Sequence, residues 1–358
     1  MSVWKCSILK VNYTTWGLGN SGGVRVILDF AREIAKRGHD VTITTLTNRA
    51  LRDEYKKLRV LSPDRHFLHK YLVHGCTRLG FLPYTTLLLS AVTPDCDINV
   101  ATFCFTAYAV QRSRKGVPFY HMQHYEPLFF SGRIPQARAE ATYVLPMHRI
   151  SNSTWLRREV YRRYGTNSTL IHPGIDTTTF SPREVRTVSK IRRVVCLGKS
   201  VRWKGLPELF TALEWVRRSL PNLELVMFGN EPGINAPVPN RYIVNPSDDQ
   251  LANLYSSADA VVTPSWYESF PLPPLEAMAC GAPVVATRYG TEDYAFDGVN
   301  SLVVSPRDVS SLAHSLLKIL TDEKLRRQLS AEGIRTAQNF KWERTAPIME
   351  GLFKAALQ

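Results

Sequence analysis

The sequence predicts an α/β protein of two domains, each a doubly wound parallel sheet with helices on both faces. Short apolar runs alternate with amphipathic helical patterns along the whole chain. Its 358 residues exceed one domain of ordinary size, and a stretch rich in turn-forming residues interrupts the alternation near position 171. We therefore expect an N-terminal domain over 1–170, a linker over 171–190, a second domain over 191–340 and a last helix over 341–358.

Each half has its own predicted strands and helices. In the first half, strands are predicted at 6–11, 41–46, 97–101, 118–126 and 149–153, and helices at 24–37, within 50–95 and at 154–164. In the second half, strands are predicted at 193–197, 223–228, 242–244, 260–263, 284–287 and 301–304, and helices at 206–218, 248–257, from 309 onward and at 343–357. Helices between successive strands indicate crossover connections and hence parallel sheets.

A glycine-rich loop precedes the first predicted helix. Residues 17–23, with the sequence GLGNSGG, match the glycine spacing of dinucleotide-binding loops. Five residues, 12–16, separate this loop from the predicted strand, and Asp40 stands before the second strand rather than at its end. We therefore interpret the loop as a cradle for an anion at a helix N-terminus, and not as a nicotinamide or flavin site.

A polar cluster ends the predicted strand at 118–126. Gln123, His124 and Glu126 stand where strand ends form the ligand crevice of open α/β sheets. We expect these side chains to serve a ligand, and His121, inside the strand, to be structural.

The most informative segment, 266–286, carries two carboxylates with seven residues between them, Glu268 and Glu276. Pro273 and Pro274 suit the entry of a short helix, which places Glu268 on the preceding loop and Glu276 in the first turn. Both side chains are then expected to face one crevice. Taken alone, such a pair indicates a general acid and a general base, as in glycoside hydrolysis.

The net charge of +14 is concentrated in the first half of the chain. Residues 1–170 contain 24 Lys and Arg against 11 Asp and Glu, whereas residues 171–358 contain 21 against 20. A basic half of this size predicts an anionic partner, either a membrane surface or a polyanion.

The apolar run at 81–92 is too short to span a bilayer, which needs about 20 residues, and no signal peptide is evident. Six scattered cysteines indicate reduced thiols rather than disulfides or a zinc site. We expect a cytoplasmic protein that is peripheral on the inner membrane face, with the basic half on an anionic surface.

Several motifs together resemble those of one enzyme family, over nearly the whole chain and most closely over 171–305. They are the E-x7-E block at 266–286, the loop at 198–205, the segment at 173–180, the Gly22-Gly23 pair and the turn at 297–303. This set resembles the retaining glycosyltransferases of family 4, which have the GT-B architecture. The resemblance implies two Rossmann-like domains facing across a cleft and a last helix that packs back on the N-terminal domain.

The resemblance also implies a reaction. A sugar would pass from a nucleotide-diphosphate sugar to a glycan or lipid-linked acceptor, without a metal or cofactor, in cell-surface polysaccharide or glycolipid synthesis. Catalytic roles fall to Glu268, Lys204 and His124. The implied donor side comprises Gly22, Gly23, Lys199, Arg202, Lys204, Phe270, Pro271, Leu272 and Glu276, and the implied acceptor side comprises Gln123, His124 and Glu126.

Four positions depart from the family pattern. Lys199 stands where the family has an arginine, so Arg202 is an alternative residue to bind the diphosphate. Gln123 and His124 replace a His-Asp pair, which leaves open which of them serves the acceptor. Ser301 replaces a glycine.

Two other functions compete with this interpretation. A nucleotide-sugar epimerase or a phosphorylase would use the same fold. A nucleic-acid-binding protein would use the basic half, but the sequence contains no recognisable nucleic-acid-binding motif.

Overall fold

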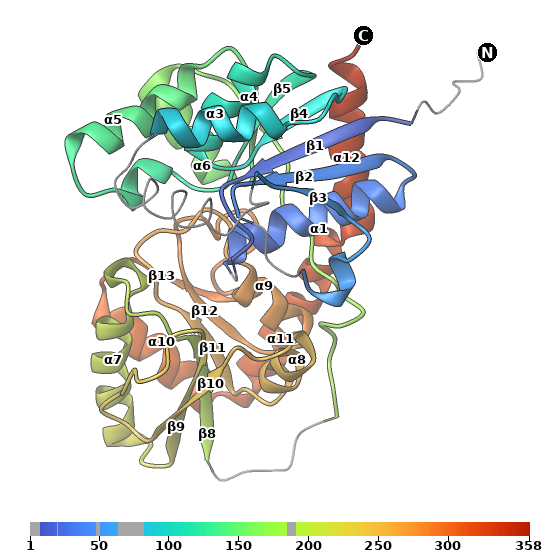
Figure 1. Ribbon diagram of the computed structural model, residues 1–358. Coiled ribbons are helices and arrows are strands. Elements are labelled where there is room, and N and C mark those ends of the chain that lie inside the picture. The colour runs from blue at the N-terminus through green and yellow to red at the C-terminus, as the bar shows by residue number, and fades with distance from the viewer. Residues whose placement is uncertain (1–7, 20, 48–50, 64–81, 185–190) are drawn as a thin grey trace. The chain divides into compact units, whose positions relative to one another are not determined.

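The computed structural model describes residues 8–19, 21–47, 51–63, 82–184 and 191–358. The chain divides into two compact units (Figure 1). Unit 1 comprises Met1–Pro173 with Glu343–Gln358, and unit 2 comprises Gly174–Trp342. The last helix of the chain therefore belongs to unit 1.

Unit 1 is built on a seven-stranded parallel sheet of order β3-β2-β1-β4-β5-β6-β7. Its strands are β1 (Lys10–Thr15), β2 (Asp40–Thr45), β3 (Arg59–Leu61), β4 (Ile98–Ala101), β5 (Val117–Met122), β6 (His148–Ser151) and β7 (Thr169–Leu170). Its helices are α1 (Gly22–Lys36), α3 (Leu82–Val92), α4 (Cys104–Ser113), α5 (Arg133–Ala141), α6 (Thr154–Tyr164) and α12 (Trp342–Ala355), with short 3-10 turns η1 (Asp53–Tyr55), η2 (Glu126–Phe129) and η3 (Thr142–Val144).

Unit 2 is built on a six-stranded parallel sheet of order β10-β9-β8-β11-β12-β13. Its strands are β8 (Arg192–Leu197), β9 (Leu223–Gly229), β10 (Asn240–Val244), β11 (Ala260–Thr263), β12 (Val284–Thr287) and β13 (Leu302–Val304). Its helices are α7 (Leu206–Ser219), α8 (Asp248–Ser256), α9 (Leu272–Ala279), α10 (Val309–Thr321) and α11 (Glu323–Ala337), with 3-10 turns η4 (Arg202–Lys204) and η5 (Gln338–Phe340). Two parallel α/β units confirm the predicted fold class.

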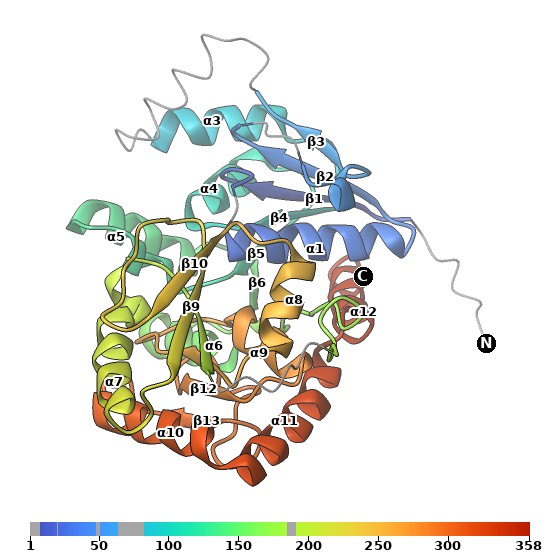
Figure 2. The ribbon, with the colours of Figure 1, turned by 90° about the horizontal axis from the view of Figure 1, so that it is seen from below.

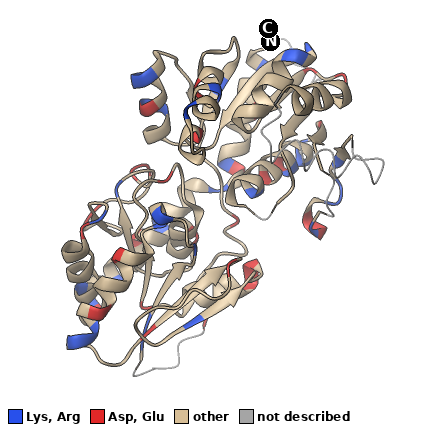
Figure 3. Ribbon diagram, turned by 60° about the vertical axis from the view of Figure 1, so that its left-hand side comes forward, with Lys and Arg blue, Asp and Glu red and all other residues tan. Residues whose placement is uncertain are grey.

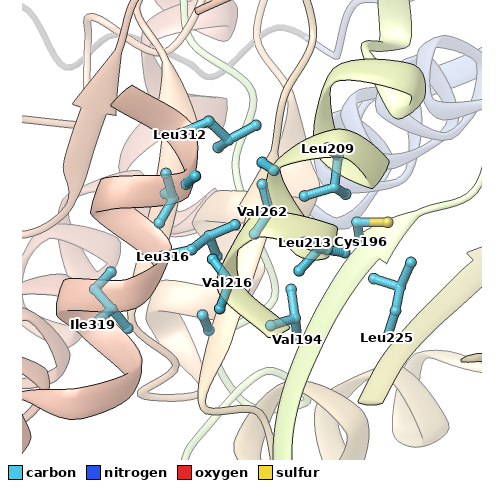
Figure 4. Close-up of a cluster of buried hydrophobic side chains, with 14 of the residues drawn as sticks. Val194, Cys196, Leu209, Leu213, Val216, Leu225, Val262, Leu312, Leu316 and Ile319 are labelled. Carbon is cyan, nitrogen blue, oxygen red and sulfur yellow. The ribbon is translucent and has the colours of Figure 1, made fainter. Parts of the chain in front are cut away.

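Helices cover both faces of each sheet. In unit 1, Phe30 of α1 and Phe353 of α12 pack on β5, while α4 and α6 cover the opposite face (Figure 2). In unit 2, the apolar side chains of α7 and α10 point toward the strands and form one core with Val194 and Val262 (Figure 4). Burial on both faces explains why most of these strands appear in the sequence as continuous apolar runs.

The first strand differs from its prediction. We expected it at 6–11, but β1 is Lys10–Thr15, so a single residue separates it from the glycine-rich loop. The error arose because Asn12 and Thr14 look like loop residues, although both are fully buried. The Asn12 amide donates to Asn99 Oδ1 at 2.9 Å, and buried polar groups are tolerated when they are hydrogen-bonded in this way. The predicted five-residue gap before the loop was therefore wrong.

Several elements were not predicted. Within the stretch expected to be helical, η1 and β3 precede α3, and residues 64–81 lie outside the described part. Helices α4 and α5 were also missed.

Part of the expected linker is core of unit 2. Phe180 is only 1% exposed, and its ring lies 6.3 Å from that of Tyr255.

The last helix is held in unit 1 by a cluster of charges around Glu350. Its carboxylate accepts hydrogen bonds from Arg37, at the end of α1, and from Lys354, and it lies 3.2 Å from His39 Nε2. Burial alone would raise the pKa of Glu350, but these donors outweigh it and lower the pKa to about 2. The carboxylate therefore remains ionised and keeps α12 tied to α1 at any ordinary pH.

Candidate active site

The candidate site in unit 2 begins where two neighbouring strands end. Strands β8 and β11 are paired, so the loops that follow them meet at the carboxyl edge of the sheet. There the Trp266 amide donates to the Trp203 carbonyl at 2.7 Å. Gly205 allows the close approach, because it has φ +70° and a Cβ there would lie 2.1 Å from the Pro264 carbonyl oxygen.

This approach brings together two predicted catalytic residues, Lys204 and Glu268. Lys204 Nζ lies 2.5 Å from Glu268 Oε1, and the Ser265 hydroxyl donates to the same oxygen at 2.7 Å. The two side chains are 18% and 12% exposed. Charges so shielded from water interact strongly, and removing either partner would leave the other one buried and uncompensated.

The loop that carries Glu268 is supported from strand β12. Thr287, the last residue of β12, donates its hydroxyl to the Ser265 carbonyl at 2.5 Å. Gly290 has φ +83°, and a Cβ there would lie 2.3 Å from the Glu268 carbonyl oxygen. Sequence reasoning missed Ser265, Thr287 and Gly290, because no local pattern marks contacts between separate loops.

Glu276 lies elsewhere than predicted. Helix α9 begins at Leu272, so Glu276 is in its second turn and not its first. The reason is that Pro273 and Pro274 lie inside the first turn, where a helix needs no N–H donor. Glu276 is 2% exposed. Burial raises the pKa of Tyr294 far above its ordinary value, and the charges of Glu268 and Glu276 both add to that rise. Both carboxylates therefore lie within electrostatic range of one hydroxyl group.

The stretch between the two glutamates has few backbone donors. Phe270 is buried against Tyr294, with ring centroids 5.1 Å apart, and the Tyr294 hydroxyl donates to the Pro271 carbonyl at 2.7 Å. Proline has no N–H, so from 270 to 274 only Phe270 and Leu272 carry an amide that an anion can meet.

Lys199 and Arg202, the two candidates for binding a diphosphate, have different surroundings. The Ser200 hydroxyl and amide donate to Glu231, and these bonds, together with the charge of Lys199, lower the pKa of Glu231. Arg202 instead holds its guanidinium carbon 5.6 Å from the ring centroid of Trp266. Lys199 therefore has an acidic neighbour, whereas Arg202 lies against an aromatic ring.

In unit 1, the predicted residues also gather at the carboxyl edge of the sheet. Ser21 caps α1, and a Cβ on Gly23 would lie 3.4 Å from Gln123 Oε1, which puts the glutamine amide against the start of the helix. Gln123 Nε2 in turn donates to the Thr102 carbonyl at 3.4 Å. His124 lies beside Phe129, with ring centroids 4.9 Å apart.

Glu126 is placed differently from these neighbours. It is 1% exposed, and its carboxylate accepts hydrogen bonds from the Cys104 amide at the start of α4 and from the Tyr120 hydroxyl at 3.0 Å. Burial raises its pKa to about 7, despite these donors. Glu126 thus holds α4 in place from within the core.

His121, inside strand β5, is also buried, and burial lowers its pKa to about 3. Its ring is therefore neutral, in agreement with the structural role expected for it.

The fold and the site define a class of protein: a two-unit parallel α/β protein with a shielded ion pair and glycine-containing loops at its strand ends. Family models agree with this class. Residues 20–179 match the model described as Glycosyltransferase Family 4, and residues 178–336 match the model described as Glycosyl transferases group 1. The chain belongs to the glycosyltransferases that these two models describe, and it is a glycosyltransferase enzyme.

Curated relatives carry related descriptions. The chain is 26% identical over 398 residues to a D-inositol 3-phosphate glycosyltransferase of Stackebrandtia nassauensis, covering 96% of this chain and 88% of the relative. It is 30% identical over 272 residues to the O-antigen biosynthesis protein RfbC of Myxococcus xanthus, covering 73% of this chain but 21% of that longer protein.

Solved structures share the fold. Sucrose-phosphate synthase from Thermosynechococcus elongatus has a TM-score of 0.80 at 19% identity, over 97% of this chain and 98% of that one. Anabaena HepE in complex with UDP-glucose has a TM-score of 0.77 at 17% identity, over 97% of this chain and 100% of that one. At these identities the likeness establishes the GT-B fold.

The buried Glu126 makes the stability of unit 1 depend on pH. A carboxyl whose pKa rises on folding stabilises the protein below its unfolded pKa of about 4.5, and that stability is lost as the pH rises through about 7. We expect urea unfolding to show a loss of about 2–3 kcal/mol between pH 4.5 and 8 that is absent in Glu126→Gln. An equal pH slope in the two proteins would contradict the assignment of Glu126 to the core.

Proposed function

We propose that this glycosyltransferase moves a hexosyl group from a nucleoside-diphosphate sugar to a glycan or lipid-linked acceptor, with retention of configuration and without a metal. The observation that carries the proposal is the shielded Lys204–Glu268 pair at the carboxyl edge of unit 2. The proposed setting is cell-surface polysaccharide or glycolipid synthesis. A relative is described as an O-antigen biosynthesis protein, which supports this setting.

The chemistry follows from where charge develops. The bond between the anomeric carbon and the diphosphate oxygen breaks with its electron pair on the diphosphate. The acceptor hydroxyl oxygen forms the new bond on the same face of the sugar and passes its proton to an oxygen of the departing diphosphate. The leaving group gains negative charge, and Lys204 is a cation already held in place to stabilise it. Glu268 keeps the ammonium group oriented, and in the complex it also accepts hydrogen bonds from hydroxyls of the donor sugar.

The other residues have supporting roles in this proposal. Glu276, on α9, accepts hydrogen bonds from the ribose hydroxyls, and the Leu272 amide meets the diphosphate at the start of that helix. The amides of Gly22 and Gly23, at the start of α1, serve the donor as well. Gln123 and His124 serve the acceptor. The structures of HepE with UDP-glucose and with UDP support the choice of a nucleotide-sugar donor.

The donor assignment can be tested with a panel of nucleoside-diphosphate hexoses and product mass. We expect Lys204→Ala to lower kcat by roughly a hundredfold or more, since it removes charge stabilisation from the leaving group. Glu276→Gln should raise the KM for the donor with a smaller effect on kcat, because it acts on ribose binding. Arg217→Ala, at the far end of α7, is the control. Full turnover by both site variants would sink the assignment, and an epimerised or phosphorolysed sugar would favour the competing functions.

We further propose that unit 1 binds an anionic membrane surface. The apolar run predicted for this role is partly used inside the unit, because Leu88 and Leu89 of α3 pack against Leu46. A more suitable surface lies on η2 and α5, which pack together. There Leu128, Phe129 and Ile134 are 39%, 44% and 68% exposed.

Charge supports the same surface. Arg133 and Arg138 are exposed on α5, and Glu126 and Glu140 are the acidic residues nearest along the chain, the first buried and the second half-buried. Figure 3 shows basic residues in blue and acidic residues in red along the ribbon. Apolar side chains flanked by arginines suit the headgroup region of an anionic bilayer. Among the helices that the structure describes, none has the length and apolar composition that a membrane span requires.

Vesicle sedimentation tests the membrane surface. We expect wild-type protein to bind phosphatidylglycerol-containing vesicles more tightly than pure phosphatidylcholine vesicles. Arg133→Gln with Arg138→Gln should weaken that binding by roughly tenfold or more, at about 1 kcal/mol per arginine. Leu128→Ser with Ile134→Ser should also weaken it, whereas Val244→Ser with Phe296→Ser, at similarly exposed positions of unit 2, should not. Equal binding to both vesicle types would contradict the electrostatic part of the proposal.

A further inference from the structure

Arg307 has a left-handed backbone conformation, which residues with a Cβ atom disfavour. It lies between β13 and α10 with φ +65°, in the left-handed region where residues other than glycine are uncommon. Arg114 shares this conformation, but it is the ordinary C-cap of helix α4. Such strain persists when the surrounding structure enforces it, and it is concentrated at functional sites.

The side chain of Arg307 lies against Trp266. Its guanidinium carbon is 3.7 Å from the centroid of the indole ring, and Arg202 approaches the same ring at 5.6 Å. Trp266 is itself fixed, since its amide bonds to Trp203 and its indole Nε1 donates to Glu208 at 3.0 Å. A rigid aromatic platform thus orients two cations.

The two arginines are not paired with a carboxylate in the described part of the chain. Neither Arg202 nor Arg307 has a carboxylate within ion-pair distance among the residues that the structure describes. The adjacent acid, Asp308, is occupied as the cap of α10, where it accepts from the Ser311 amide at 2.9 Å and from the Ser311 hydroxyl at 2.6 Å. Glu208 accepts a hydrogen bond from the edge of the same ring, so one carboxylate accompanies two guanidinium groups, and the remaining positive charge favours an anion.

The platform adjoins the ion pair of the candidate site along both chain segments. Trp266 lies two residues before Glu268, and Arg202 lies two residues before Lys204. We propose that Arg307 and Arg202, oriented by Trp266, form a second anion-binding element that holds a phosphate or carboxylate group of a substrate beside the Lys204–Glu268 pair. This inference rests on the proposed transferase function, and it adds a residue, Arg307, that the family resemblance does not assign.

Two substrates can supply such an anion: the diphosphate of the donor, or an anionic group on the acceptor. The recognition chemistry is the same, because a planar guanidinium binds two oxygens of either group. Calorimetric titrations with UDP, GDP and ADP examine the donor source, and titrations with glucose 6-phosphate and with glucose examine a phosphorylated acceptor.

Arg307→Gly is the decisive variant, because glycine suits the left-handed backbone and the fold should survive. We expect its Tm to stay close to that of wild type, while the Kd for the anionic ligand rises roughly tenfold. Arg307→Lys should recover part of the affinity by restoring the charge. Arg114→Gly is the matched control, since it removes one exposed arginine with positive φ from unit 1 and should leave the Kd unchanged.

The outcomes distinguish a donor anion from an acceptor anion, and they distinguish failure of the Arg307 inference from failure of the proposed transferase function. Weaker nucleotide binding by Arg307→Gly assigns the platform to the donor, and weaker glucose 6-phosphate binding alone assigns it to the acceptor. Unchanged binding of both ligands, or no anion binding by wild type, overturns the inference. If wild type transfers a glycosyl group but Arg307→Gly binds both ligands normally, the proposed function stands and the inference about Arg307 fails. If anion binding depends on Arg307 but no glycosyl group is transferred, the inference stands and the proposed function fails.

Discussion

The ion pair between Lys204 and Glu268 is the contact around which the candidate site is arranged. It joins the loops after two neighbouring strands, β8 and β11, and each partner is held in place by a separate support. Gly205 allows the Lys204 loop to approach Pro264, and Ser265 donates to the Glu268 carboxylate. Each of these two shielded charges compensates the other, so the loops that hold them are constrained together.

A second constraint concerns the start of α9. Helix N-termini usually bind anions through free backbone N–H groups. Here Pro271, Pro273 and Pro274 remove most of those donors, and Leu272 supplies the one amide among them. Positive side chains from other loops must then provide most of the favourable interaction with a diphosphate. Lys204 is one such cation, and on our proposal Arg202 and Arg307 are two more.

The sequence predicted the parts of this arrangement that leave a local pattern. Parallel strands buried on both faces appear as apolar runs, and the spacing of Glu268 and Glu276 is visible directly. β1 was placed too early, because Asn12 and Thr14 are polar and their burial depends on partners such as Asn99, which lies far along the chain. Glu276 was placed one turn too early because the prolines form the first turn instead of preceding it.

Contacts between distant segments could not be predicted. Trp203 and Trp266 are ordinary aromatic residues in the sequence, and the hydrogen bond between their backbones exists only because β8 and β11 are neighbours. Arg307 gives no sign of its positive φ, since a glycine is the residue that normally marks that conformation. Glu126 looked like a ligand group because its strand-end position is visible in the sequence, whereas its burial among tyrosines is not.

If Lys204 and Glu268 act as one unit on the donor, a double-mutant cycle on kcat/KM for the donor will measure their coupling. The variants are Lys204→Met, Glu268→Gln and the combination, which keep the side-chain volumes similar. We predict strong coupling, with the double variant no more impaired than the worse single variant. Losses that multiply independently would contradict it, because they would mean that the two side chains serve the reaction separately.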